Sequence, residues 1–280
     1  MTLEVNVASV QFDIKSGDKG RNLSRAIELL EKAAEHNVDI AAIPDYFLTG
    51  YPVTKENVAK WAETIPGPTT DRLSETAKVH KMYIVGGSII ERENERFYCT
   101  CPVFGRDGNL VGKYRKVNFW MMPPLNEADS GLTPGTDYPV FRTDFGVIGV
   151  LLQVDIDFPE TARVLALKGA EIIFWLTGVD YPWIDVCRCL ARAYAFSNLA
   201  YLITVNRTGT MQGYLYYGES TIINPMGEII ASAGQSYGNM FLEDMAIATI
   251  DLQLVRKLRQ MLDPFGRRKP DTFRIITRSQ

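Results

Sequence analysis

The chain has 280 residues, of which 46% are hydrophobic and 22% charged, and its net charge is −3. This length and composition allow one large core, so we expect a single domain over residues 1–280. The absence of a basic run argues against nucleic acid as a partner, and no apolar stretch approaches the length of a membrane span. The N-terminal segment lacks the basic and apolar blocks of a secretory signal, so the expected location is the cytoplasm.

The first half of the chain alternates segments with strand-like and helix-like apolar patterns. In order, these patterns predict a strand over Leu3 to Phe12, a helix over Asn22 to His36, a strand over Val38 to Ile43, a helix over Thr69 to Lys81, a strand over Met82 to Ile90, and a hairpin of Arg96 to Phe104 with Leu110 to Lys113. The turn of that hairpin contains Asp107-Gly108, a dipeptide typical of hairpins.

The centre of the chain reads as strand, sharp turn, helix and strand. Val147 to Leu152 is an apolar run of strand length, as in a strand buried on both faces. Pro159 suits the first turn of the next helix, where its missing N–H costs nothing, and Lys168-Gly169 ends that helix. The corner between strand and helix lies at the carboxyl end of the predicted sheet, where α/β proteins place a nucleophile or a ligand.

The last third continues the alternation. It predicts a helix over Pro182 to Asn198, strands over Ala200 to Asn206, Thr221 to Ile223, Glu228 to Ser232 and Ala246 to Asp251, and a helix over Leu252 to Met261. Strands and helices that alternate in this way indicate the α/β class.

Cysteine and histidine offer little catalytic or metal-binding potential. The cysteines form two C-x-C pairs, Cys99/Cys101 and Cys187/Cys189. The first pair would share one face of a strand and the second would diverge on a helix, so we expect buried structural thiols rather than zinc ligands, and no cofactor. His36 and His80 lie in polar helical stretches, away from any turn that could hold a nucleophile. The sequence therefore offers no good histidine for a Ser-His-Asp or Cys-His mechanism.

The central segment resembles the nucleophile segment of the nitrilase (carbon–nitrogen hydrolase) superfamily. That segment is usually a strand, then Cys-Tyr-Asp, then a helix beginning Phe-Pro-Glu. Here Asp155 and Phe158-Pro159-Glu160 fit the pattern, but Gln153 stands at the cysteine position and Val154 at the tyrosine position. A carboxamide is not a nucleophile at neutral pH, so the covalent chemistry of the family does not follow from the resemblance.

Two further segments match motifs of the same family. The sequence PDYFLTGYP resembles Pro-Glu-x-Phe-x-Thr-Gly-Tyr, whose glutamate is the general base, and it has the shorter Asp45 at that position. Spacing alone favours a turn or helix-capping role for Asp45, and the resemblance is what points to a base. Lys116 matches the catalytic lysine of Gly-Lys-Tyr-Arg-Lys, which stabilises an oxyanion in the family.

A second glutamate often precedes a Thr-Pro-Gly turn in the family. Thr133-Pro134-Gly135 supplies this turn, and Glu127 is the expected match, with Asp129 as the alternative and an ordinary surface acid as the third possibility.

The resemblance covers essentially the whole chain and implies a four-layer α-β-β-α sandwich. It also implies a homodimer or larger assembly that pairs through the helices at 159–168 and 182–198. Tyr51, Trp120, Val154 and Trp175 fall on segments that border the cleft in the family, so they are candidate substrate-binding residues, although core packing would explain the aromatic ones equally well.

The changes at the two altered positions are complementary in size. Glutamine is longer than cysteine, and aspartate is shorter than glutamate. We therefore expect the Gln153 amide to enter the site, with its NH₂ donating to Asp45 and its oxygen accepting from Lys116, in the place of a substrate amide.

Three functions remain open, so the sequence does not decide whether the protein is an enzyme. The first is an altered or inactive family member that binds a partner protein or a small ligand with an amide, nitrile or carboxyl group. The second is an enzyme that uses acid–base chemistry through Asp45, Lys116 and Glu127. The third is a hydrolase in which one of the cysteines replaces the nucleophile.

Overall fold

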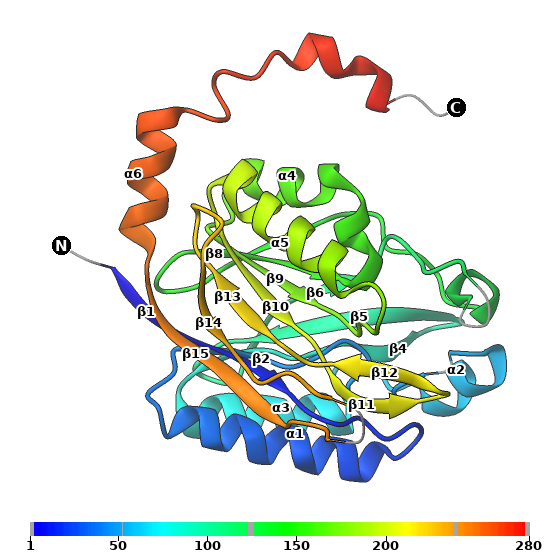
Figure 1. The fold of residues 1–280 in the computed structure, drawn as a ribbon. Coiled ribbons are helices and arrows are strands. Elements are labelled where there is room, and N and C mark those ends of the chain that lie inside the picture. Colours follow the sequence, from blue (N-terminus) through cyan, green and yellow to red (C-terminus); the bar gives the residue numbers. More distant parts are fainter. Residues whose placement is uncertain (1–2, 52, 123–125, 238–239, 278–280) are drawn as a thin grey trace.

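The computed structural model describes residues 3–51, 53–122, 126–237 and 240–277. Two large sheets pack face to face, and helices cover the outer side of each sheet (Figure 1). The predicted α/β class and the four-layer α-β-β-α sandwich are therefore confirmed. Among the described residues, the structure contains no helix with the length and apolarity needed to cross a lipid bilayer.

The first sheet has the strand order β15-β1-β2-β3-β5-β4, with β6 paired to β5. Its strands are β1 (Glu4–Gln11), β2 (Ile40–Ala42), β3 (Tyr83–Val85), β4 (Ile89–Glu93), β5 (Arg96–Phe104), β6 (Leu110–Arg115) and β15 (Asp244–Asp251). The helices that precede or follow these strands are α1 (Lys19–Ala34), α2 (Lys55–Trp61) and α3 (Pro68–His80). Of these, α1 and α3 cover the outer face of the sheet (Figure 1).

The second sheet has the order β14-β13-β10-β9-β8-β7. Its strands are β7 (Val140–Arg142), β8 (Val147–Leu152), β9 (Ile172–Leu176), β10 (Tyr201–Val205), β13 (Thr221–Ile223) and β14 (Ile229–Ser232). Helices α4 (Pro159–Leu167) and α5 (Ile184–Asn198) cover its outer face (Figure 1). The remaining elements are the hairpin β11 (Thr208–Met211) with β12 (Tyr214–Tyr217), α6 (Leu252–Leu262), and the 3₁₀ helices η1 (Glu127–Ser130), η2 (Gln153–Asp157) and η3 (Pro270–Thr277).

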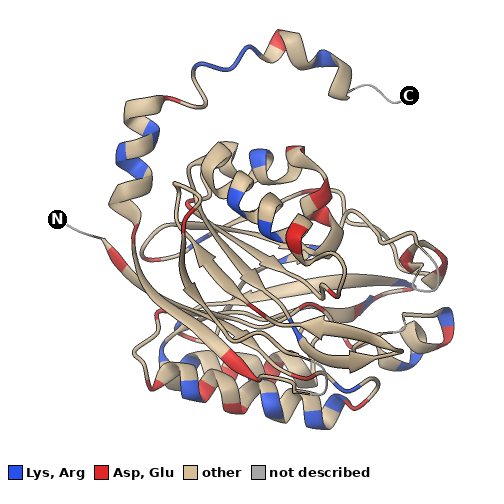
Figure 2. Ribbon diagram, in the orientation of Figure 1, with Lys and Arg blue, Asp and Glu red and all other residues tan. Residues whose placement is uncertain are grey.

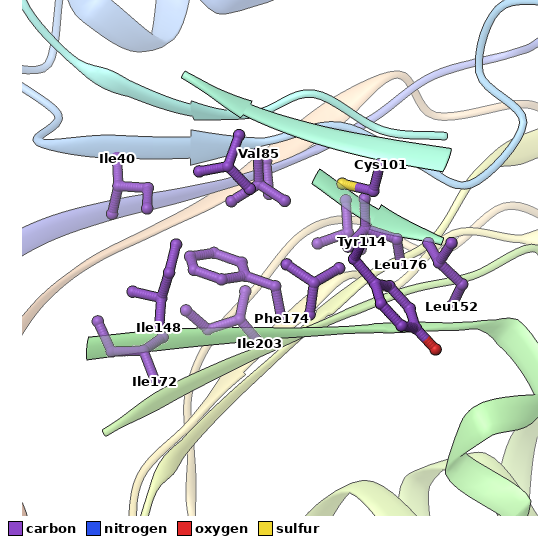
Figure 3. Close-up of a cluster of buried hydrophobic side chains, with 14 of the residues drawn as sticks. Ile40, Val85, Cys101, Tyr114, Ile148, Leu152, Ile172, Phe174, Leu176 and Ile203 are labelled. Atoms are coloured by element: carbon purple, nitrogen blue, oxygen red, sulfur yellow. The ribbon is translucent and has the colours of Figure 1, made fainter. Parts of the chain in front are cut away.

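The main core lies between the two sheets. Figure 3 shows Ile40 and Val85 of the first sheet facing Ile148, Phe174 and Ile203 of the second. Successive side chains of a strand point to opposite faces, so each central strand contributes to two cores. In β9, for example, Ile172, Phe174 and Leu176 enter the core between the sheets, while Ile173 and Trp175 pack under α4 and α5. Basic and acidic residues are interspersed along α1 and basic residues lie on α6, whereas the central strands carry few charged residues (Figure 2).

Most predicted elements are present, with shifted ends. The prediction of one strand over Met82 to Ile90 is wrong, because the chain breaks at Gly86-Gly87 into β3 and β4, which lie on opposite sides of β5. Gly87 has φ +63°, and a Cβ there would lie 2.6 Å from the Pro44 carbonyl oxygen. Helix α1 starts three residues before the predicted Asn22, because Asp18 caps it by accepting from the Arg21 N–H. Helix α2, strand β7 and the β11–β12 hairpin were not predicted from the sequence.

Candidate active site

Three of the predicted site residues follow strand ends that converge between the sheets. Asp45 comes three residues after β2, Lys116 directly after β6, and Gln153 directly after β8. The structure brings these side chains, together with Glu127 of η1, into one hydrogen-bonded group. We call Asp45, Lys116 and Glu127 the buried charge cluster, because each of the three side chains is at most 1% exposed.

Lys116 and Glu127 form the tightest pair of the cluster. The Lys116 ammonium donates to both Glu127 carboxylate oxygens, at 2.8 and 2.7 Å. The Tyr46 hydroxyl and the Trp120 backbone N–H each donate to the same carboxylate at 2.7 Å. Asp129, the alternative from the sequence, is exposed and accepts from the Asn126 amide. Glu127 is therefore the acid that lies beside Lys116.

The environment keeps the Lys116 ammonium charged. Burial alone would lower the pKa of Lys116, but the negative charges of Glu127 and Asp45 outweigh this effect and raise it above the ordinary lysine value. A buried ammonium of this kind is tolerable because it is paired and hydrogen-bonded.

Around Asp45, burial outweighs the groups that stabilise its carboxylate. Its carboxylate accepts from the Ser88 hydroxyl at 2.5 Å and from the Tyr51 hydroxyl at 3.3 Å. Burial raises the pKa of Asp45 to about 6, although Lys116 and Ser88 act in the opposite direction. The resulting pKa is close to neutral pH, as expected of a general base.

Gln153 lies over Lys116, held in an uncommon backbone conformation. Its φ is +43°, in the left-handed region that residues other than glycine rarely adopt, and its carbonyl oxygen accepts from the Trp175 indole N–H at 2.8 Å. The side-chain oxygen accepts from Lys116 at 3.0 Å and from the Tyr51 hydroxyl at 2.9 Å. Strain of this kind at a strand end is common at functional sites.

This geometry agrees with half of the expected arrangement. The oxygen of the Gln153 amide faces Lys116 as predicted, which is required because an ammonium only donates. The expected donation from the Gln153 NH₂ to Asp45 is absent, because the Tyr51 hydroxyl lies between the two side chains and shares its single proton between the Gln153 oxygen at 2.9 Å and the Asp45 carboxylate at 3.3 Å. The sequence suggested Tyr51 only as an aromatic wall, so its polar role was missed.

A cavity of about 420 Å³ opens on the outer side of Gln153 and Tyr51. All four candidate substrate-binding residues line it, namely Tyr51, Trp120, Val154 and Trp175. Trp183, Tyr214 and Tyr216 add further aromatic surface. We call this space the aromatic cavity. Its lining does not include Asp45, Lys116 or Glu127, so Gln153 and Tyr51 form a partition between the buried charge cluster and the space open to a ligand.

The sequence and the fold are similar to those of known proteins. Over residues 6–260 the sequence matches the family model described as carbon–nitrogen hydrolase. The chain belongs to the carbon–nitrogen hydrolase family. It is 33% identical to omega-amidase NIT2 of Xenopus tropicalis over 95% of each chain, and 31% identical to omega-amidase NIT2 of Bos taurus over 96% of each.

Solved structures of the same family share the fold. Nit3 of Saccharomyces cerevisiae, a member of branch 10 of the nitrilase superfamily, superimposes with a TM-score of 0.80 at 28% identity, over 92% of this chain and 94% of that one. A carbon–nitrogen hydrolase of Helicobacter pylori has a TM-score of 0.85 over 99% of both chains, and at 21% identity that likeness concerns the fold.

In this member of the carbon–nitrogen hydrolase family, Asp155 fixes the corner that carries Gln153. The carboxylate accepts from the Tyr114 hydroxyl at 2.5 Å, the Leu152 backbone N–H at 2.9 Å and the Asn118 side-chain amide at 3.0 Å. These contacts tie the segment after β8 to the segment around Lys116. From the sequence, Asp155 was expected only as a position of the family motif, and no local pattern indicated its contact with Asn118.

The thiols of this family member are poorly suited to attack a substrate. Cys99 and Cys101 are fully buried in the core between the sheets, and burial raises the pKa of each. Cys187 lines the aromatic cavity, where burial and the carboxylates of Asp157 and Asp180 raise its pKa to about 12. Cys189 is exposed on α5. Within the described ranges, no three His, Cys, Asp or Glu side chains are grouped so as to hold a metal ion.

Proposed function

We propose that this protein binds a small ligand and has lost the thiol-dependent hydrolysis of its family. In this assignment Gln153 stands at the position of the family's catalytic cysteine and Asp45 at that of its glutamate base. The observation that carries the proposal is the position of the Gln153 side-chain oxygen, 3.0 Å from the Lys116 ammonium and 2.9 Å from the Tyr51 hydroxyl. The donors that could polarise a substrate carbonyl are therefore engaged by the protein's own carboxamide.

The partition formed by Gln153 and Tyr51 supports the same proposal. A general base has to come within hydrogen-bond reach of the proton it abstracts, either directly or through one water. Asp45 is 1% exposed, and its contacts are to Ser88 and Tyr51 rather than to the aromatic cavity. A ligand in the cavity thus meets the Gln153 amide before any ionised group of the cluster.

A second candidate is an enzyme that uses acid–base chemistry through Asp45, Lys116 and Glu127. The observation in its favour is the pKa of Asp45, which burial raises to about 6. It requires the Gln153 side chain to rotate out of the partition and admit the substrate to the cluster.

A replacement nucleophile has weaker support. Cys187 is the cysteine that lines the aromatic cavity, and its thiolate is disfavoured at neutral pH because its pKa is about 12.

The ligand class follows from the family. Relatives of the chain over nearly its full length are named omega-amidases, so we propose a ligand that carries an amide or nitrile group. The Gln153 nitrogen, which has no hydrogen-bond partner among the described residues, could donate to the oxygen or nitrogen of such a group.

The decisive experiment measures ammonia release from a panel of amides, nitriles and N-carbamoyl compounds. It compares the natural chain with the double variant Gln153→Cys/Asp45→Glu. The matched control is Gln153→Ala/Asp45→Glu, which opens the same space without a nucleophile. We expect release from the cysteine-containing variant alone, because it restores nucleophile and base beside an intact Lys116.

Turnover by the natural chain would overturn the proposal. Its loss in Lys116→Ala would then support acid–base chemistry, whereas its loss in Cys187→Ser would support a replacement nucleophile. Silence from every variant would remove the evidence that a hydrolase pocket is preserved here.

We also propose that the protein pairs with itself through α4 and α5. Large apolar side chains lie exposed on or beside these helices, namely Phe158, Leu167, Val186 and Phe196. Exposed apolar surface of this kind indicates an interaction site. Light scattering of the eluting protein should give the mass of a dimer, and Phe196→Glu should reduce it to that of a monomer. A monomeric natural chain would refute this pairing.

The cytoplasmic location remains a prediction, which cell fractionation would check.

A further inference from the structure

Among the described residues that line the aromatic cavity, the charged side chains are all acidic. Among the residues that line it, the ionisable acids are Asp157 at the end of η2 and Asp180 in the loop after β9, and no lysine or arginine lines it. Neither carboxylate has an ion-pair partner within the described residues. Asp157 lies at the exposed rim, while Asp180 is half-buried and its backbone is bridged to that of Tyr216.

Two basic groups lie behind this wall rather than on it, and the positive charge of Arg207 acts on the Tyr216 side of the cavity, away from the side that holds Asp157 and Cys187. Arg207 is fully buried behind the ring of Tyr216, 4.4 Å from its centroid, and donates to the Ile14 carbonyl oxygen at 2.6 Å. Arg188 of α5 is already paired with Glu219 at 2.5 Å and with Asp185 at 3.1 Å.

The pKa of a neighbouring thiol reflects the negative charge beside the cavity. Cys187 lies in the wall beside both acids, and after burial the charges of Asp157 and Asp180 are the causes that raise its pKa. A field that disfavours the thiolate anion favours a cation at the same place. The same field repels a carboxylate.

The rest of the wall also suits a cation with an apolar body. The rings of Trp120, Trp175, Trp183, Tyr214 and Tyr216 line the space, and aromatic faces attract ammonium groups. Thr177 also lines the cavity, and its hydroxyl is a polar group of this wall that lacks a partner among the described residues. It is buried, its residue being 2% exposed, and its oxygen has no hydrogen-bond partner in the described part of the chain.

We propose that the aromatic cavity binds a small organic cation, an amine with an apolar or aromatic body. Its ammonium group lies beside Asp180 and Asp157, and its body lies against the aromatic wall. The opposite end of the ligand faces the Gln153 amide. This inference rests on the proposed function, because it assigns a ligand class to the same cavity. It excludes the carboxyl-bearing ligands that the family resemblance also allowed.

The test uses three probes of one shape and different charge with the full-length protein at pH 7. They are 2-phenylethylamine, 2-phenylethanol and 3-phenylpropionate, and binding is measured by titration calorimetry. We expect the amine to bind at least about tenfold more tightly than the alcohol, and the carboxylate to bind most weakly.

Variants locate the origin of the selectivity. Asp157→Asn/Asp180→Asn keeps the shape of the wall and removes its charge, so it should weaken amine binding about tenfold and leave alcohol binding unchanged. Unchanged alcohol binding also shows that the variant is folded. The control Asp185→Asn removes an exposed carboxylate of α5 that does not line the cavity, and should leave all affinities unchanged.

Three outcomes would overturn the inference: carboxylate binding as tight as amine binding, amine binding that survives loss of both carboxylates, or no binding of any probe at millimolar concentration. Ammonia release by the natural chain would overturn the proposed loss of hydrolysis, but it would leave amine selectivity intact, so the two failures can be told apart.

Discussion

The buried charge cluster and the aromatic cavity are neighbours with opposite properties. In the cluster, Lys116 and Glu127 are almost completely buried and satisfy each other at 2.7–2.8 Å. In the cavity, Asp180 lacks an ion pair among the described residues and the Thr177 hydroxyl lacks any hydrogen-bond partner there. The polar groups of the first region are paired within the protein, whereas these two groups of the second have no such partner among the described residues.

The difference agrees with the proposal that the ligand binds in the aromatic cavity rather than in the buried charge cluster. Groups that are satisfied internally stabilise the fold and gain nothing from a ligand, while unsatisfied groups around an open space gain free energy when one binds. Gln153 and Tyr51 separate the two regions, and Gln153 contacts both. Variants of either region therefore test whether the partition is real.

The largest expected effect is on stability, from removal of the cluster's cation. Lys116→Met leaves Glu127 buried without its main partner, and breaking a buried pair in this way costs about 3–5 kcal/mol. The free energy of unfolding, measured in urea, should fall by that amount. The control Lys168→Met removes a surface pair with Asp137 and should cost less than about 1 kcal/mol. Equal losses in the two variants would mean that water reaches the cluster and that the partition does not close it.

The next effect is a pH dependence that originates in Asp45. Its pKa is raised from 3.8 to about 6 in the folded protein, chiefly by burial, so the folded state holds the proton more tightly than the unfolded chain. The stability contributed by protonated Asp45 is full below the unfolded pKa and is lost as the pH rises through about 6.

Asp45→Asn cannot lose a proton, so it removes this dependence. Relative to the natural chain, the variant should gain about 3 kcal/mol of stability between about pH 4 and pH 7, because one pKa unit corresponds to about 1.4 kcal/mol. Urea unfolding of both proteins across this range gives the difference directly. A difference that stays constant with pH would show that Asp45 is accessible to solvent, which would bring the cluster and the cavity into one space.

The sequence predicted the elements that a periodic apolar pattern defines. The strand expected over Val147 to Leu152 is β8 with the same bounds, and Pro159 begins α4 as its fixed φ predicts. The apolar pattern did not predict where the backbone conformation ends a strand. Gly87 breaks a continuous apolar run, because only a glycine fits against Pro44 with a positive φ. The β11–β12 hairpin was missed because its strands are four residues long, too short to show a period.

The site residues likewise fall into those that a local motif locates and those that depend on packing between distant segments. Asp45, Lys116, Glu127 and Gln153 could be located by resemblance, because each belongs to a motif that survives in one stretch of sequence. The Tyr51 bridge joins residues 102 apart in the chain, and the pairing of Asp157 with Asp180 on one wall depends on how η2 meets the loop after β9. Contacts of this kind arise from packing between segments, and no local spacing encodes them.

The smallest effect should come from the Thr177 hydroxyl of the cavity wall. Burying a hydroxyl without a partner costs free energy, so Thr177→Val, which keeps the shape, should stabilise the free protein by about 1 kcal/mol. The control is Thr204→Val on β10, whose hydroxyl contacts the Thr221 hydroxyl at 2.9 Å and accepts from the Thr221 N–H at 2.7 Å. That change removes satisfied contacts and should destabilise by about 1–3 kcal/mol. Thermal unfolding of both variants without ligand gives the comparison. If Thr177→Val destabilised as much as Thr204→Val, the hydroxyl would already be satisfied in the free protein, and the contrast between a complete cluster and an incomplete cavity would lose its sharpest local evidence.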